Sequence, residues 1–229
     1  DKLDAAVNGG GSGGGGSESG GSNPTFVGEL YIAEDKNYKG YFEQFYSISE
    51  IENTYGSDWV DNYLENGIWN YALSSIQSLD TNEVTPCFAY RNTENGYKPL
   101  RHFNSLMRNC NSIRNAFQSC VELESWYCVA NSVDEAQYAF QGCINLKHFR
   151  GIMKAINGGH GMFGTYSEDC TQLDLASVQF IADNFGWGSW NTLSLGVSNT
   201  LQGSYELEQA VNKIYTNGWN VEVIYSSNG

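Results

Sequence analysis

The chain of 229 residues is poor in positive charge, with 12 Lys and Arg residues against 26 Asp and Glu residues and a formal net charge of −14. Such an excess of carboxylates repels phosphate groups, which argues against nucleic-acid binding and against attachment to an anionic membrane surface. No apolar run approaches the roughly 18 residues that a membrane-spanning helix needs, so we expect no membrane insertion. The length suits one large domain or two small ones.

Motifs for catalysis and cofactor binding are also lacking. No Ser, His and Asp residues are arranged around a GxSxG nucleophile elbow, and the sequence has no phosphate-binding loop or dinucleotide fingerprint. None of the six cysteines belongs to a CxxC pair, which argues against a zinc site. We therefore predict no cofactor, no metal ion and no catalytic residue.

The N-terminal part divides into a tether and an aromatic-rich region. Residues 1–23, with "GGGSGGGGSESGGS" at 9–22, have the composition of a flexible Gly/Ser tether or an assembly anchor. We expect residues 24–105 to form a small α+β region. Ser47 and Glu50 have capping-box spacing and predict a helix that ends at Gly56. The other expected elements here are one strand or a short strand pair at 25–34, a helix that ends at Gly67 with Trp59, Tyr63 and Leu64 on one face, a strand or helix at 67–79, and a hairpin at the Asn-Gly pair 95–96.

A repeat begins near residue 106. The segments "NAFQSCVELESW" at 115–126 and "YAFQGCINLKHF" at 138–149 are nearly the same, and Phe117, Phe140 and Phe163 are evenly spaced. Around each Phe, apolar residues recur at helical spacing, which predicts a short helix or 3₁₀ turn with one buried stripe. Two more stripes surround Ile181 and Val211. Each stripe is followed by a strand-like segment, at 121–126, 144–149, 171–176, 191–196 and 220–225.

A unit of one helical turn and one strand cannot bury its apolar face alone, so it must stack on its neighbours. We therefore predict an α/β fold in which residues 106–229 form five stacked units, right-handed, with parallel strands in one sheet. Trp219 is expected to cover the C-terminal end of the stack. Cys120 and Cys143 occupy the same place in consecutive units, beside Phe and Leu, which indicates buried, reduced thiols.

The repeats resemble those of a known family. "AFQSCVEL" and "AFQGCINL" are similar to the M/A-F-x-x-C-x-x-L core of BspA-type (Treponema pallidum-type) leucine-rich repeats, and the ending "AVNKIYTNGWNVEV" resembles the terminus of that group. The resemblance covers residues 106–229. Only two units carry the complete motif, since "GTYSED" splits the third and the fourth lacks the Cys. The resemblance implies a leucine-rich-repeat solenoid that serves recognition or assembly, as in bacterial surface adhesins and tailed-phage virion proteins.

These features lead to three functional hypotheses. The first is a non-enzymatic virion component of a tailed phage, in a fibre, the tail or the capsid surface. Its partners would be other virion subunits or a host-surface glycan or protein, within a larger assembly such as a homo-oligomer. The second is an adhesin on a bacterial cell surface. The third is a glycan-degrading tail spike with Glu122, Glu124 and Asp174 as outward carboxylates, although Lys147 between them favours a solvated charge row.

Two surfaces are candidates for recognition. Side chains alternate between the two faces of a strand, and the predicted strands place one row of residues outward. The second surface is the loop "FGWGSW" at 185–190, because two indoles are costly to expose without a ligand; they could instead pack under the fourth strand. His148 is expected to face the core, and His160 to lie in a Gly-rich turn. The predicted ligand-binding residues are Glu124, Trp126, Lys147, Phe149, Asp174, Ser194, Trp187 and Trp190.

Overall fold

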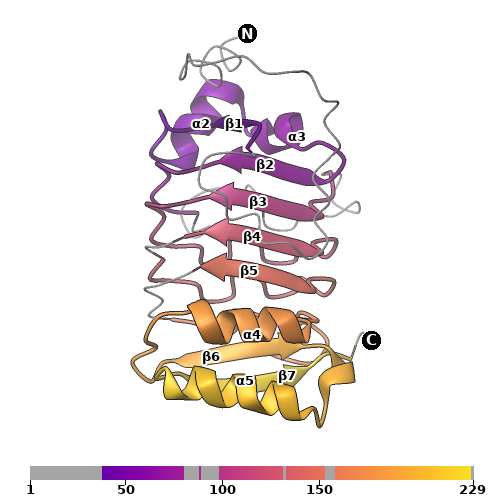
Figure 1. Ribbon diagram of the computed structural model, residues 1–229. Coiled ribbons are helices and arrows are strands. Elements are labelled where there is room, and N and C mark those ends of the chain that lie inside the picture. The colour runs from indigo at the N-terminus through magenta and orange to yellow at the C-terminus, as the bar shows by residue number, and fades with distance from the viewer. Residues whose placement is uncertain (1–37, 80–87, 89–97, 131–132, 153–157, 228–229) are drawn as a thin grey trace, which may run out of the picture.

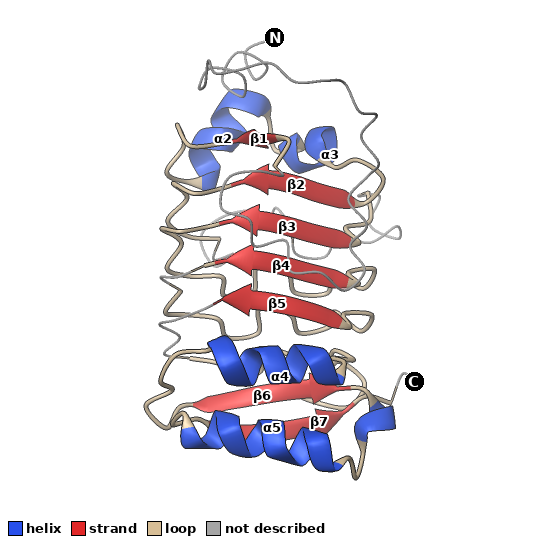
Figure 2. Cartoon of the chain, in the orientation of Figure 1, coloured by secondary structure: helices blue, strands red, loops and turns tan. Residues whose placement is uncertain are grey.

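The computed structural model describes residues 38–79, 88, 98–130, 133–152 and 158–227. The predicted tether at 1–23, the strand at 25–34 and the hairpin at 95–96 lie outside the described residues. Within them the chain is a mixed α/β structure with two parallel sheets (Figure 1). Helices lie at the N-terminal end and along one side of the C-terminal part (Figure 2).

The larger sheet stacks its strands in sequence order. All neighbouring strands are parallel. His102 pairs with Ser125 and Ser125 pairs with His148, so each step from β3 to β5 advances the chain by 23 residues. Strand β3 spans the predicted boundary at residue 106 and has a paired strand on each side. The strands are β1 (Gly40–Tyr41), β2 (Ile68–Ala72), β3 (His102–Leu106), β4 (Ser125–Val129) and β5 (His148–Ile152).

Helices α2 (Ile48–Tyr55) and α3 (Trp59–Tyr63) lie at the N-terminal end of this sheet (Figure 1). The predicted capping box is confirmed: the Glu50 amide donates to the Ser47 hydroxyl, and the Glu50 carboxylate accepts from the Ser47 amide, both at 3.3 Å. Helix α2 ends at Gly56, as predicted, with φ +88°. The undecided segment 67–79 contains strand β2.

Two columns of aromatic rings fill the core. In each column the rings stack on one another, with interplanar angles between 4° and 26°. Rings of one column meet those of the other edge to face, as Phe117 does with Trp126 at 80°. Phe117, Phe140 and Phe163 lie in one column, as the predicted stacking of the units requires. The first column is Trp69, Phe103, Trp126 and Phe149; the second is Phe88, Phe117, Phe140 and Phe163.

The apolar stripes at 113–120, 136–143 and 159–163 are buried as predicted, but they form consecutive turns and not helices. Left-handed residues recur at Asn115, Tyr138 and Gly161, with φ of +54°, +56° and +63°. They rotate alternate amides toward the next unit, so that Phe117 donates to the Ala139 carbonyl (3.0 Å), and other stripe residues repeat the pattern. A helix would use these amides internally and could not link the units.

The strands of the C-terminal part do not extend the larger sheet. The prediction of one sheet through all five units is wrong, because β6 (Thr192–Val197) and β7 (Asn220–Tyr225) form a separate parallel pair. Helix α4 (Leu175–Asn184) lies beside β5 in the place of the next strand. A 3₁₀ turn, η1 (Asn199–Leu201), precedes α5 (Tyr205–Thr216), which packs beside α4 (Figure 1).

The predicted strand at 171–176 is replaced by the start of α4. Asp174 caps this helix, its carboxylate accepting from the Ser177 amide at 2.7 Å. The Ser177 hydroxyl in turn accepts from the Phe149 amide at 2.9 Å. Helix α4 thus supplies a hydrogen-bond acceptor for a backbone amide of β5. Leu173 makes only an isolated bridge, with Val197 of β6. The strands of the last two units therefore pair on the side of the turns.

The described cysteines are free and buried, as predicted: Cys110, Cys120, Cys128, Cys143 and Cys170. Burial raises the pKa of Cys110 to about 12 and that of Cys143 well above its ordinary value. A thiol with such a pKa stays protonated at neutral pH, and only the thiolate is a strong nucleophile or metal ligand. Cys110 and Cys143 therefore serve as small apolar core groups.

Candidate functional site

Three of the predicted recognition residues are buried. Trp126 and Phe149 have no exposed surface, and Ser194 is 1% exposed. The chain turns at Leu123 and Leu146 before β4 and β5 begin, at Ser125 and His148, four residues later than predicted. These turns interrupt the predicted alternation, and Trp126 and Phe149 occupy inward positions. The Ser194 hydroxyl accepts from the Gly161 amide at 2.9 Å, which ties β6 to the turns. These three side chains hold the fold together and do not belong to a recognition surface.

The other three residues of the predicted row do lie on successive rungs. Backbone hydrogen bonds join them: the amides of Glu124, Lys147 and Asp174 donate in turn to the carbonyls of Arg101, Glu124 and Lys147, at 2.8, 3.1 and 3.0 Å. The formal charges alternate along this row. Glu124 and Lys147 are exposed. Exposed charges of alternating sign are well solvated and contribute little stability, which favours the charge row over a pair of hydrolytic carboxylates.

A second polar row lies next to it, at the first residues of the strands. His102 Nδ1 is 2.9 Å from the Ser125 hydroxyl, and His148 Nδ1 is 2.8 Å from the Asp174 carboxylate. His148 was expected to face the core, but its side chain is 42% exposed because β5 begins at this residue. The Ser177 hydroxyl donates to Asp174 (2.6 Å) and not to His148. This arrangement joins β5 to α4 and does not make a Ser-His-Asp relay.

Burial and hydrogen bonding shift two pKa values in this row. Burial lowers the pKa of His102 below its ordinary 6.5, although the Glu124 carboxylate opposes the shift. For Asp174 burial acts to raise the pKa, but hydrogen bonds from His148 and Ser177 outweigh it and leave the pKa below 3.8. The fold therefore favours neutral His102 and ionised Asp174. Both groups therefore contribute to the free energy of unfolding in their deprotonated form. Acid removes the contribution of His102 below pH 6.5 and that of Asp174 below about pH 4.

We expect Asp174→Ala to lower the free energy of unfolding by about 1 kcal/mol at pH 7, through loss of the α4 cap and of the His148 partner. Asp174→Asn keeps a capping oxygen and removes the charge, so it should cost less. The folded pKa of Asp174 is depressed, so its charge stabilises above pH 4 and ceases to do so as the pH falls through that value. Urea unfolding between pH 7 and pH 3 should show the wild type and Asp174→Asn converging. A difference that stays constant down to pH 3 would contradict this account.

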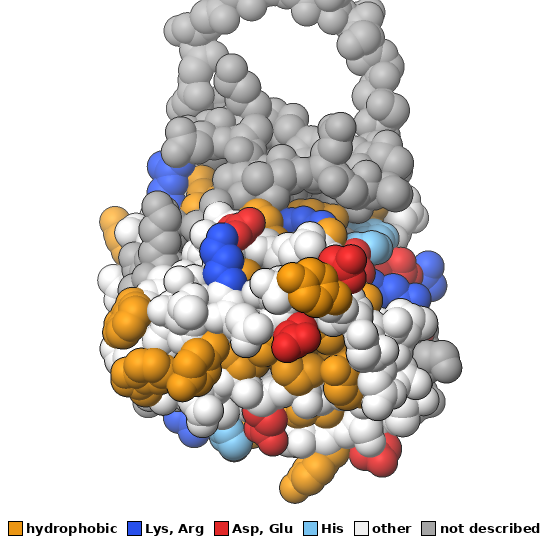
Figure 3. Space-filling model, turned by 60° about the horizontal axis from the view of Figure 1, so that its bottom comes forward, with side chains coloured by type: hydrophobic (Ala, Val, Ile, Leu, Met, Phe, Trp, Pro, Cys, Tyr) orange, Lys and Arg blue, Asp and Glu red, His pale blue; other side chains and the backbone are white. Residues whose placement is uncertain are grey.

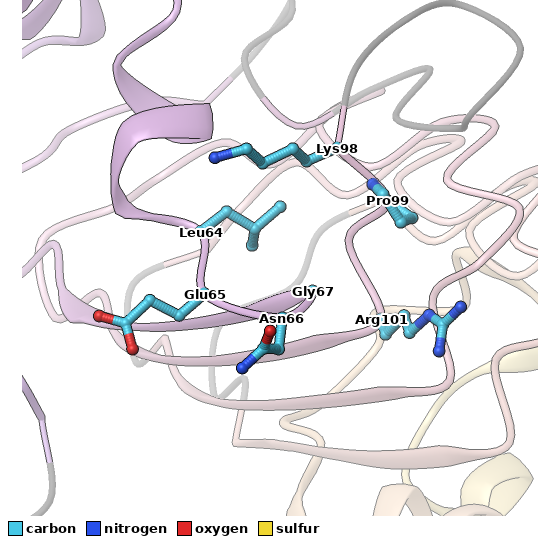
Figure 4. A pocket seen from close by; sticks show the side chains of 7 residues that line it. All are labelled: Leu64, Glu65, Asn66, Gly67, Lys98, Pro99 and Arg101. Atoms are coloured by element: carbon cyan, nitrogen blue, oxygen red, sulfur yellow. The ribbon is translucent and has the colours of Figure 1, made fainter.

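A hollow of about 690 Å³ lies at the start of strands β2 and β3 (Figure 4). Its basic groups are both engaged: Lys98 donates to the Asp61 carbonyl at 2.6 Å, and Arg101 lies 3.9 Å from the Glu122 carboxylate. Glu65 on its wall is paired with Lys39. The charged groups of the hollow therefore already have partners within the protein. Its lining residues are Leu64, Glu65, Asn66, Gly67, Lys98, Pro99 and Arg101.

The second candidate surface is an aromatic corner formed by Trp187, Trp190 and Tyr215. Their exposed fractions are 61%, 58% and 52%. Trp187 and Trp190 belong to the loop between α4 and β6, and Tyr215 belongs to the last turn of α5. The centroids of the two indoles are 6.3 Å apart at 77°, and those of Trp190 and Tyr215 are 5.4 Å apart at 66°. The space-filling view of the α5 end shows hydrophobic side chains gathered at the surface (Figure 3).

The loop that carries the indoles is held by its backbone. Ser189 and Trp190 both adopt left-handed φ, +50° and +62°. The Gly188 amide donates to the Asn217 carbonyl (3.0 Å), which fixes the loop to the end of α5. A Cβ on Gly218 would come within 2.7 Å of the Trp187 ring. The absence of that atom lets the indole lie directly on the backbone.

Trp219 packs against the backbone of the loop that carries Trp187 and Trp190. It was expected to cover the end of the stack, but it is fully buried, and its indole Nε1 donates to the Gly186 carbonyl at 2.9 Å. A Cβ on Gly188 would meet its ring at 2.3 Å. Strand β7 follows Trp219 directly in the chain. The prediction of exposed Trp187 and Trp190 is thus confirmed, with Trp219 as their buried base.

Tyr215 was not identified from the sequence. It follows the buried Ile214 and falls on the polar face of α5, and an aromatic ring on a polar helix face is the signal that could have found it. The contact with Trp190 joins segments that are distant in the chain. Only the pairing of α5 with the loop before β6 brings these rings together.

Comparisons of the chain with family models, with curated proteins and with solved structures gave no match. In the described part of the chain, no group of three or more His, Cys, Asp or Glu side chains is placed to hold a metal ion. The helices of the described residues are too short or too polar to cross a membrane.

Proposed function

We propose that this protein is a non-enzymatic recognition module built as a leucine-rich-repeat solenoid, and that it serves as a tailed-phage virion component. Three features support the solenoid: the 23-residue register of β3 to β5, the two aromatic columns, and the amide ladder between the turns. Units that contact only their neighbours are the basis of such architectures. The motif shared by 115–126 and 138–149 supplies the link to BspA-type repeats.

The observation that carries the recognition role is the aromatic corner. Its three rings are each more than half exposed, and the backbone beneath them is fixed by hydrogen bonds and close packing. Clustered exposed apolar groups on a soluble protein indicate an interaction site. Trp and Tyr give large contact areas at a small entropic cost, and they dominate binding energies at interfaces.

The virion and the bacterial cell surface remain the two proposed locations, because the resemblance to BspA-type repeats implies either a tailed-phage virion protein or a bacterial surface adhesin. Co-purification of the protein with virus particles would support the virion, and its loss from whole cells after mild protease treatment would support an adhesin. Release of reducing sugar from host polysaccharide would instead support a glycan-degrading spike. The lysine between Glu124 and Asp174 counts against that third role.

The recognition role can be tested by labelling intact bacteria with the fluorescent protein and measuring the cells by flow cytometry. On strains that the wild type labels, the triple variant Trp187→Ala/Trp190→Ala/Tyr215→Ala should bind at least about tenfold more weakly, since the loss of even one aromatic hot spot costs about 2 kcal/mol, and about 1.4 kcal/mol is already tenfold. Tyr166→Ala and Tyr205→Ala are matched controls, because these rings are 71% and 68% exposed and lie outside the aromatic corner. Equal labelling by the triple variant would rule out the aromatic corner as the recognition surface.

A further inference from the structure

We propose that the aromatic corner binds a quaternary ammonium group, such as the trimethylammonium group of choline. This inference rests on the proposed recognition role and names the class of its ligand. Aromatic rings attract a cation to their faces, and sets of rings that surround one point are the usual receptors for methylated ammonium groups. Trp187, Trp190 and Tyr215 supply three such rings, in one place and all open to solvent.

The ring angles favour a compact cation. Trp190 is the shared ring, and its neighbours meet it at 77° and 66°. Faces that meet so steeply bound a corner, where one methylated ammonium group can touch two rings at once. An extended glycan chain is better served by coplanar rings on which successive sugars lie flat. The geometry therefore distinguishes between two ligands that aromatic side chains commonly bind.

The local charge favours a cation as well. Tyr215 belongs to the last turn of α5, and the Trp190 amide donates to the Gly218 carbonyl just beyond that helix. The carbonyl end of a helix carries a partial negative charge. Lys213, the basic residue in the last turn, is paired with Asp183. The net charge of −14 adds an attractive field for cations.

The test is a titration followed by tryptophan fluorescence and calorimetry, with choline chloride as the probe. Its neutral counterpart is 3,3-dimethylbutan-1-ol, which has the same shape and no charge. We expect saturable choline binding and at least about tenfold weaker binding of the alcohol, equivalent to about 1.4 kcal/mol. Trp190→Ala should weaken choline binding by a similar factor, and Tyr205→Ala should not change it. Equal binding of the two probes, no choline binding, or unchanged binding by a folded Trp190→Ala variant would each overturn the proposal.

Two further experiments, vesicle binding and competition by choline in cell labelling, identify the source of the quaternary ammonium group. They also separate this proposal from the proposed recognition role. Binding to phosphatidylcholine vesicles would indicate a lipid headgroup, and choline binding without vesicle binding would indicate a free or polymer-linked choline. Choline should also compete with cell labelling. If labelling requires the aromatic corner but choline does not compete, the quaternary ammonium ligand is wrong and the recognition role stands. If the triple variant labels cells like the wild type, the recognition role itself fails.

Discussion

Replacing Trp126 by alanine should lower the free energy of unfolding by about 3–5 kcal/mol, the loss typical of a large aromatic ring removed from a packed core. The ring is fully buried and stacks on Phe103 and Phe149 at 5.9 and 5.1 Å. Phe117 and Phe140 meet it edge to face. Since domains are stable by about 5–15 kcal/mol, urea unfolding followed by circular dichroism should show a large drop in the midpoint.

Two variants control this experiment. The indole Nε1 of Trp126 has no hydrogen-bond partner among the described residues, so Trp126→Phe removes an unsatisfied donor, keeps a stacked ring and should cost much less than Trp126→Ala. Tyr166→Ala removes a ring that is 71% exposed and should change stability by less than about 0.5 kcal/mol. A similarly small change for Trp126→Ala would mean that the indole faces solvent, as strand alternation in the sequence suggested.

The sequence revealed the repeat and its core positions. Phe117, Phe140 and Phe163 are evenly spaced, and a ring that recurs once per unit must lie in a column if the units stack. The left-handed residues Asn115 and Tyr138 gave no comparable signal, because Asn and Tyr are compatible with the predicted helical turns. Turns with left-handed residues and helical turns can share the same apolar spacing, so the pattern identified the buried face but not the backbone.

The strand starts could not be obtained from the pattern. In "VELESW" and "INLKHF" apolar and polar residues alternate over the first four positions, which predicts a strand that begins at the first residue of either segment. Two adjacent polar residues then end the alternation in each. The chain instead turns at Leu123, whose amide donates to the Cys120 carbonyl at 3.0 Å, before β4 begins. The turn breaks the alternation, so that Leu123 and Trp126 both face the core although they are three residues apart. Treating each segment as one continuous strand therefore placed Trp126 and Phe149 on the wrong side of the sheet.

After β5 the chain forms helix α4 where the next strand was predicted, and this replacement depends on tertiary contacts. Asp174 looked like one more outward charge, but with Ser177 it forms the start of α4. The sequence did predict the buried stripe of this helix, including Val178 and Ile181. It could not show that α4 would occupy the place of the next strand, because that choice depends on the hydrogen bond from the Phe149 amide to Ser177.

Deleting one whole unit is expected to leave a folded protein, because equivalent residues can take over its contacts. Removal of residues 125–147 joins Glu124 to His148 and preserves the 23-residue register. Strand β5 then pairs with β3, and Phe163 can stack on Phe117. A deletion of residues 125–136, about half a unit, breaks the register and places polar residues in the core. We expect this shorter deletion to abolish cooperative folding, although it removes less of the chain.

Urea unfolding of these two deletion variants is the most direct test of the stacked repeat. The stacked arrangement predicts a single cooperative transition for the variant lacking 125–147, with a smaller dependence on urea because less surface is buried, and no cooperative transition for the variant lacking 125–136. Equal behaviour of the two variants, or a cooperative transition in the shorter deletion alone, would show that the 23-residue register does not hold the structure together.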